Sequence, residues 1–148
     1  MITLATARIV LPLVVVVVAI ASELRTKEIP NWLTFGAFLA AWPLAYFAGT
    51  LPLAAGGFFL AFGVILIGYQ KGYVGGGALK LAGAIGALTS PTVALAIIVV
   101  AIAAAAASWR WAKHVLEKDL SAHPPVPPGS ICVAIGTIMG LLLAARFG

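Results

Sequence analysis

Charged residues are scarce in this chain. They make up 9% of its 148 residues, whereas 63% are hydrophobic. A typical soluble domain carries roughly a quarter charged residues, so the chain lacks the polar surface that such a domain needs. Several apolar runs separated by short polar clusters are typical of a helical membrane protein. The sequence therefore predicts one all-α, polytopic membrane domain over residues 1–148, with no length left for a second domain.

Cysteine is almost absent. The single thiol, Cys132, excludes an intrachain disulfide and any cysteine-rich zinc module. It lies in an apolar stretch, and we interpret it as a small packing residue. His114 and His123 lie in a polar segment that offers no further ligands at suitable spacing, so we expect solvated side chains there. We therefore expect neither a metal nor a cofactor.

Acidic residues are also few: four against nine basic ones, which gives a net charge of +5. They are Glu23, Glu28, Glu117 and Asp119. A basic balance can indicate a nucleic-acid partner. Here, however, the basic residues cluster at the ends of apolar runs, where they report membrane topology. We expect the lipid bilayer, and no nucleic acid, as the surroundings of this chain.

Six helices are predicted, each an apolar run between polar or glycine- and proline-rich segments. Their ranges are 6–22, 32–48, 51–69, 78–89, 91–108 and 130–145. The fifth begins at Pro91, because proline is favoured in the first turn of a helix. The sequence HPPVPP before the sixth helix predicts a stiff connector.

Basic residues are distributed unequally between the two sides of this topology. The side with the loops after the first, third and fifth helices holds Arg25, Lys27, Lys71, Lys80, Arg110, Lys113 and Lys118. The other side holds Arg8 and Arg146. Because positive residues are retained in the cytoplasm, the sequence predicts the cytoplasmic (inner) membrane, with the three long loops inside and both termini outside.

A cleavable signal peptide is the alternative for the N-terminal segment. Arg8, the apolar run and AIAS have that pattern. The run is long for a signal peptide, and Arg25 and Lys27 follow it directly, which favours retention of the first helix.

Two polar segments interrupt the apolar pattern, SELRTKEIPN at 22–31 and GGGALKL at 75–81. Ionisable groups at membrane depth are costly, which makes Glu23 and Lys80 candidate functional residues. Glu23 could instead form an interfacial pair with Arg25, and Lys80 could extend to the lipid headgroups. Both segments face the cytoplasm in the predicted topology, so they can converge on one pocket.

The residues around these charges predict local geometry. Pro30 favours the start of the next helix, with Asn31 and Trp32 as a turn and an interfacial aromatic anchor. The glycines at 75–77 permit positive φ and the close approach of another backbone or of a substrate. A helix that begins just after them at Ala78 would direct unpaired N–H groups toward the pocket.

Both segments resemble the motifs of a known family. SELRTKEIPNWLT is similar to the segment that in type IV prepilin peptidases reads aspartate, one variable residue, arginine, a few variable residues and IPNWLT. GGGALKL resembles the family's second motif of glycines, aspartate, one variable residue and Lys-Leu. The resemblance covers essentially the whole chain, including the six-helix layout.

The resemblance implies an intramembrane aspartic endopeptidase that removes the basic leader of pilin precursors at the cytoplasmic membrane face. It implies a prepilin or a pilin helix as the partner. Larger family members carry a zinc domain with paired cysteines and methylate the new N-terminus, and this chain has neither those cysteines nor that insertion. It is similar to the compact subgroup associated with Flp-type (tight adherence) pili and archaeal preflagellins.

The resemblance places the two catalytic aspartates of the family at Glu23 and Ala78, so both positions are substituted. The other motif residues, with implied structural or substrate-binding roles, are Arg25, Pro30, Asn31, Gly75, Gly76, Gly77 and Lys80. Aspartic proteolysis needs two carboxyl groups that share one proton. We therefore expect no prepilin cleavage, and geometry argues against rescue by Glu28 or Asp119.

Three interpretations stay open on the sequence. Ala78 is either an engineered replacement in a peptidase or part of a natural pseudopeptidase that acts as a scaffold in pilus or secretion assembly. Small residues such as Ala82, Gly83 and Gly86 would let helices, or a docked pilin helix, pack closely. A small transporter is the third interpretation, because the fourth helix is short and follows glycines. It is disfavoured because helices one, two, five and six carry no charge near the bilayer midplane.

Overall fold

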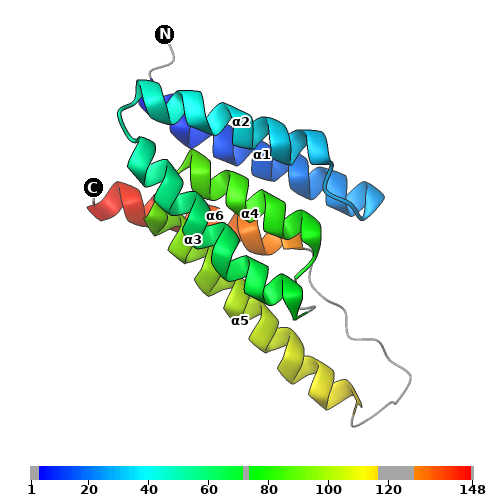
Figure 1. Cartoon of the computed structure of the whole chain (residues 1–148). Coiled ribbons are helices and arrows are strands. Elements are labelled where there is room, and N and C mark those ends of the chain that lie inside the picture. Colours follow the sequence, from blue (N-terminus) through cyan, green and yellow to red (C-terminus); the bar gives the residue numbers. More distant parts are fainter. Residues whose placement is uncertain (1–3, 72–73, 117–128, 148) are drawn as a thin grey trace.

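The computed structural model describes residues 4–71, 74–116 and 129–147, which form six helices (Figure 1). These are α1 (Leu4–Thr26), α2 (Asn31–Phe47), α3 (Leu51–Gln70), α4 (Gly76–Leu88), α5 (Pro91–Leu116) and α6 (Gly129–Phe147). The all-α prediction is therefore confirmed for this part of the chain. The connector HPPVPP, His123 and Asp119 lie outside the described residues.

Two helices, α1 and α5, continue by at least one turn beyond their predicted C-terminal ends. α5 extends to Leu116 rather than ending at Ser108, because the residues that follow the alanine-rich stretch include no glycine or proline to end the helix. α1 continues past Ser22 to Thr26, whose hydroxyl donates to the Ser22 carbonyl oxygen at 2.9 Å. Lys27 then adopts a φ of 60°, which ends the helix.

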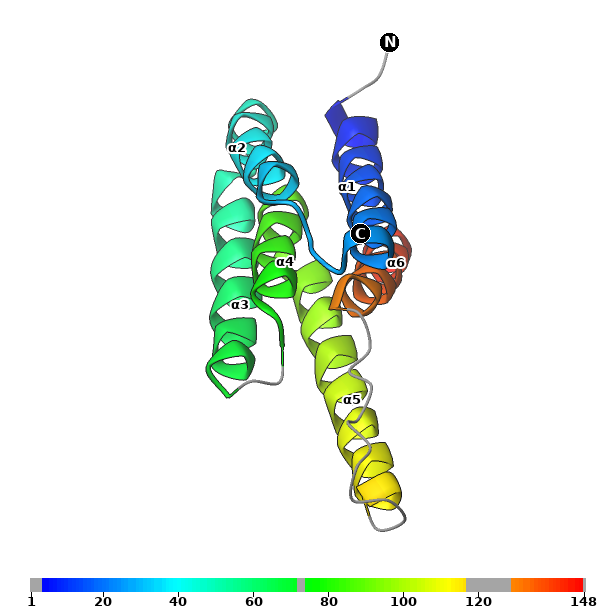
Figure 2. The same ribbon diagram turned by 90° about the vertical axis from the view of Figure 1, so that its right-hand side faces the viewer.

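The short helix α4 occupies the centre of the bundle. In Figure 2 it lies between α2 and α3 on one side and α1 and α6 on the other, and it contacts all five of the other helices. Every residue in 81–88 is buried. α1, α3 and α5 run in one direction and α2, α4 and α6 in the other (Figure 1), so the ends of α1 and α3 lie near the starts of α2 and α4.

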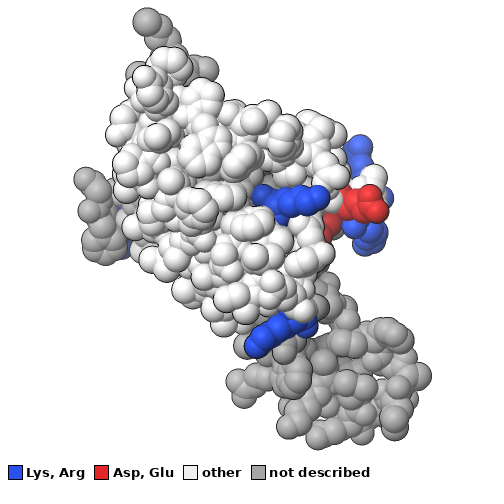
Figure 3. Space-filling view, viewed as in Figure 1, with Lys and Arg blue, Asp and Glu red and all other residues white. Residues whose placement is uncertain are grey.

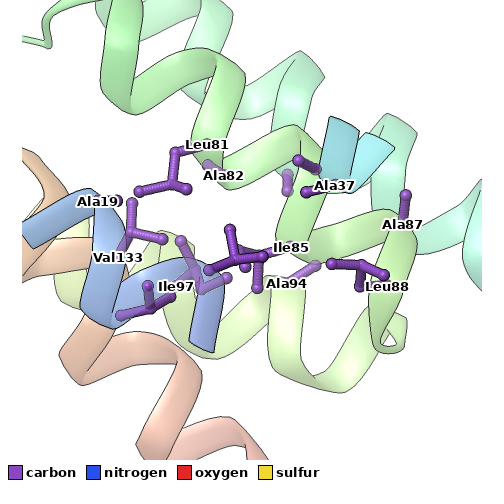
Figure 4. Packing of buried hydrophobic residues seen from close by; sticks show 14 of the residues in the cluster. Ala19, Ala37, Leu81, Ala82, Ile85, Ala87, Leu88, Ala94, Ile97 and Val133 are labelled. Carbon is purple, nitrogen blue, oxygen red and sulfur yellow. The ribbon is translucent and has the colours of Figure 1, made fainter. Parts of the chain in front are cut away.

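The core forms where α4 meets the helices around it. Ala19 of α1, Leu81 of α4 and Val133 of α6 are buried in one cluster and point toward one another (Figure 4). Ile85 and Ile97 are fully buried in the same cluster. Because α4 offers mainly alanine, glycine, leucine and isoleucine, it can be apolar on every face and still fit between its neighbours.

Glycines allow backbones to meet at two helix crossings, α3 with α4 and α5 with α6. A Cβ on Gly57 of α3 would overlap the carbonyl of Gly86 of α4, and a Cβ on Gly86 would overlap that of Gly57. On α6, a Cβ at Gly136 would lie 2.5 Å from the Cα of Ile97, and one at Gly140 would lie 2.7 Å from the Cα of Val93. These crossings require residues without side chains, which is how helices associate in lipid.

Among the described residues, two helical stretches are long and apolar enough to cross a membrane, Thr6–Thr26 and Leu51–Gln70. Three further apolar helices are shorter, Gly76–Leu88, Pro91–Ala103 and Ile131–Arg146. Length and composition therefore support a membrane protein.

Replacing Gly57 with alanine should destabilise the fold, because the new Cβ must displace the Gly86 backbone. Overpacking of this kind costs about 1–3 kcal/mol. The control is Gly63→Ala on the same helix, where a Cβ would meet nothing within 4 Å and the change should stabilise by about 0.5–1 kcal/mol. Thermal unfolding in detergent, followed by circular dichroism, measures the difference, and equal stabilities would contradict the backbone contact.

Candidate functional site

The two motif segments meet at the end of the bundle where α2 and α4 begin. The Lys80 ammonium of α4 donates a hydrogen bond to the side-chain carbonyl oxygen of Asn31 at 2.8 Å. A Cβ on Gly77 would lie 3.1 Å from the Cβ of Ile29, so this glycine packs directly against the segment before α2. One polar and one apolar contact thus connect 22–31 to 75–81, as the sequence predicts for a shared pocket.

Pro30 fixes the start of α2. It stands at the N-cap with φ −66° and ψ 134°, values that the pyrrolidine ring permits. Its carbonyl accepts hydrogen bonds from the N–H groups of Leu33 and Thr34, at 3.1 and 3.5 Å. Asn31 is therefore the first helical residue, and this position directs its amide toward Lys80. Trp32 beside it is 71% exposed, as an interfacial anchor requires.

The glycine run is more regular than the sequence predicts. α4 begins at Gly76 and not at Ala78, because the Gly75 carbonyl already accepts the N–H of Leu79 at 3.2 Å. Gly75 is extended with φ −73°, and the only glycine with positive φ among the described residues is Gly49. The run therefore serves close packing rather than a left-handed turn, with Gly76 against the Tyr69 ring and Gly77 against Ile29.

Glu23 and Ala78 each lie about one helical turn from the buried contact between Ala19 of α1 and Leu81 of α4. Glu23 follows Ala19 by four residues on α1, and Ala78 precedes Leu81 by three residues on α4, so each shares a helix face with its partner. Ala19 and Leu81 point toward each other (Figure 4), and α1 and α4 run in opposite directions (Figure 1). One turn forward on α1 and one turn back on α4 therefore lead to the same end of the bundle.

The surroundings of these two positions differ. Ala78 is buried, with 5% of its surface exposed. Glu23 is half-buried, and its carboxylate interacts electrostatically with the thiol of Cys132 in the first turns of α6. α6 therefore contributes to this site beside α1, α2 and α4. The sequence pattern indicates only a packing role for Cys132, and its place at the start of an apolar run is the one signal of this proximity.

The remaining charged residues of the first motif lie at the surface. Arg25, Lys27 and Glu28 are all exposed. In Figure 3 the charged side chains in view gather at this end of the molecule, and the broad face beside them is uncharged. Glu28 is therefore not directed into the core beside Ala78, which agrees with the expectation that it does not replace a buried acid.

A comparison with protein families identifies the group to which the two motif segments belong. A family model described as the type IV leader peptidase family matches residues 9–109. The chain belongs to the type IV leader peptidase family. The matched range contains both motif segments, all of α2, α3 and α4, and most of α1 and α5. No curated protein and no solved structure matches the chain.

Leader peptidases of this family are aspartic-type enzymes, and that chemistry depends on two carboxyl groups. One carboxylate draws a proton from the attacking water while its protonated partner polarises the scissile carbonyl. At the two positions that the motif resemblance aligns with the family's aspartates, this chain has the carboxyl group of Glu23 at the end of α1 and the methyl group of Ala78 on α4. A methyl group can neither accept a proton nor donate a hydrogen bond.

Cysteines at positions 23 and 78 should be linked by a short bifunctional thiol reagent, because both positions lie on facing sides of one helix pair. The experiment uses Glu23→Cys with Ala78→Cys in a Cys132→Ser background, and mass spectrometry detects the intramolecular link. The matched control is Leu24→Cys with Ala78→Cys, since Leu24 is 55% exposed and points away from the core. Equal linking of both pairs, or none at 23 and 78, would contradict the facing arrangement.

Proposed function

We propose that this member of the leader peptidase family is a polytopic protein of the cytoplasmic membrane, with its motif segments on the cytoplasmic side and both termini outside. Its outward-facing surface supports this placement. Among the described side chains, large apolar residues are exposed on α1, α2, α3, α5 and α6. Examples are Val17, Phe35, Phe59, Ile102 and Leu142. In water such a surface would be unfavourable, whereas lipid accepts it.

The charge distribution supports the orientation. The end of the bundle that carries the motif segments holds four basic residues, Arg25, Lys27, Lys71 and Lys80. Arg8 belongs to the opposite end, where its guanidinium donates to the carbonyl of Thr89, just after α4, at 3.1 Å. An excess of basic residues at one membrane side favours the cytoplasm for that side.

The proposed substrate is a prepilin, whose basic leader and apolar helix would be held where the two motif segments meet. The single observation that carries this proposal is the direct contact of both family motifs, through Lys80 with Asn31 and Gly77 with Ile29. This contact keeps the motif scaffold intact in a chain whose acid pair is incomplete. Binding of substrate is therefore compatible with the fold even though cleavage is not.

We propose further that the chain is inactive as a peptidase. The buried methyl group of Ala78 can neither accept nor donate the proton that the two carboxyl groups of an aspartic peptidase share. Glu23 itself is one methylene longer than aspartate, and a displacement of about 1 Å costs roughly a hundredfold in rate. The same observation favours the alternative function, a pseudopeptidase that binds pilin segments as a scaffold in pilus or secretion assembly.

Restoring both aspartates should restore leader removal. We expect no cleavage by the chain as it stands, low activity from Ala78→Asp alone, and roughly a hundredfold more from Glu23→Asp with Ala78→Asp, because the longer glutamate misplaces one carboxyl group. The assay incubates detergent-purified protein with a matching prepilin and follows the loss of the leader by mass.

The matched control is Glu23→Asp with Ala78→Asn, which has the shape of the restored pair without its second acid. Cleavage by this control, or by the unaltered chain, would refute the acid-pair argument. A restored pair that still binds prepilin without cutting it would favour the scaffold function.

Membrane orientation can be tested by thiol accessibility in a Cys132→Ser background. Lys27→Cys, at the motif end, should react with a membrane-impermeant maleimide only after spheroplasts are lysed. Leu51→Cys, at the opposite end and 42% exposed, should react in intact spheroplasts. The reverse pattern would contradict the proposed orientation. Reaction of both cysteines in intact spheroplasts would show that the motif end is not on the cytoplasmic side.

A further inference from the structure

A groove separate from positions 23 and 78 runs between α2, α3 and α4. Its volume is about 420 Å³. Its lining residues are Asn31, Thr34, Phe35, Phe38, Phe58, Phe62, Lys80 and Ala84. Half of them are phenylalanines, so the groove is apolar along most of its length.

Polar groups gather at one end of this groove. Asn31 and Thr34 belong to the first turn of α2, and Lys80 lies in the second turn of α4. Lys80 is the only ionisable residue among those lining the groove, and its side chain is exposed. An ammonium group has three donors, of which Asn31 accepts one at 2.8 Å. Two donors and a full positive charge remain for an anion at the mouth of the groove.

The apolar part of the groove has a continuous aromatic wall. The rings of Phe58 and Phe62 stack with centroids 5.3 Å apart, and Phe38 approaches Phe58 at 5.1 Å. Phe35 on the rim is 62% exposed, so the groove opens sideways toward the surroundings of the helices. In a bilayer this opening would face the acyl chains of the lipids.

The volume decides between a helix and a single extended chain as the occupant. An α-helix with its side chains is about 10 Å wide, so a space of this size would enclose only about one turn of it. An unbranched acyl chain is much thinner and can follow the aromatic wall for most of its length. Because the Lys80 ammonium lies at the mouth of the groove, the occupant is expected to carry an anionic group at that end.

We propose that this groove binds an anionic phospholipid, with one acyl chain along Phe38, Phe58 and Phe62 and the phosphate at Lys80 and Asn31. The proposal relies on membrane placement of the chain but not on peptidase chemistry. Cationic side chains at the cytoplasmic membrane surface attract anionic headgroups, and the Lys80–Asn31 pair holds its donors at the point where the acyl chain would emerge.

Native mass spectrometry of the full chain in detergent tests the proposal with two added probes, phosphatidylglycerol and phosphatidylethanolamine. We expect one retained phosphatidylglycerol in preference to phosphatidylethanolamine. Lys80→Gln should reduce that preference about fivefold, the effect of one basic residue at an anionic surface, and Lys80→Arg should preserve it. Phe35→Ala should weaken retention of both lipids because it removes part of the apolar rim.

Matched controls separate this groove from the general surface. Lys71→Gln removes an exposed cation outside the groove, and Phe47→Ala removes a phenylalanine that is 72% exposed on the same helix as Phe35. Both should bind lipid as the unaltered chain does. Circular dichroism confirms folding of each variant. Equal preference in Lys80→Gln and the unaltered chain, or equal losses in Phe35→Ala and Phe47→Ala, would overturn the proposal.

A peptide probe distinguishes lipid from a protein helix in the same place. A synthetic apolar helix with one acidic residue near its N-terminus is added to the same samples. If its binding, and not that of phosphatidylglycerol, depends on Lys80 and Phe35, the groove is a helix-docking surface and the lipid proposal is wrong. Prepilin cleavage by Glu23→Asp with Ala78→Asp is measured in its own assay. Failure of the lipid proposal therefore leaves the peptidase proposal testable, and the reverse.

Discussion

Gly57 of α3 and Gly86 of α4 meet backbone to backbone, and this contact sets how closely the central helix can approach its neighbours. In lipid there is little hydrophobic force between apolar helices, so association depends on van der Waals contact at short range. α4 satisfies that requirement with small side chains, and its residues 81–88 are buried on every side. Gly136 and Gly140 of α6 extend the same principle to α5. The position of every motif residue on α4 follows from this packing.

The same core explains how the chain can retain its fold with an altered acid pair. An aspartate at position 78 would place a carboxyl group in a site that is 5% exposed, which is costly at membrane depth. The methyl group of Ala78 carries no such cost. Functional acids in cores are commonly kept at the expense of stability, so, under the proposed correspondence of position 78 with a family aspartate, alanine there would exchange chemistry for stability. Glu23 is less buried than Ala78, so a carboxyl group there is less costly.

Lys80 and Asn31 connect the motif end to the aromatic groove. Their hydrogen bond holds the start of α2 against α4, and the same ammonium faces the mouth of the groove. A bound anion there would compete with or add to the Asn31 contact. The proposed lipid would therefore be physically coupled to the geometry of the two motif segments, whether or not the acid pair is complete. This coupling gives the lysine a role that does not require it to touch a scissile bond.

The sequence by itself determined the six helices, their order and the two segments that carry the motifs, because apolar runs and their polar or glycine- and proline-rich breaks are local properties. Local rules were less successful at helix ends: α4 begins two residues earlier than predicted, since a Gly75 carbonyl and an Ile29 side chain support that first turn. Only the tertiary structure decided that Lys80 pairs with Asn31, that Glu23 lies near Cys132, and that four phenylalanines form a groove. These features depend on how each helix is rotated about its axis against residues distant in sequence, and contacts between helices, rather than local propensity, fix that rotation.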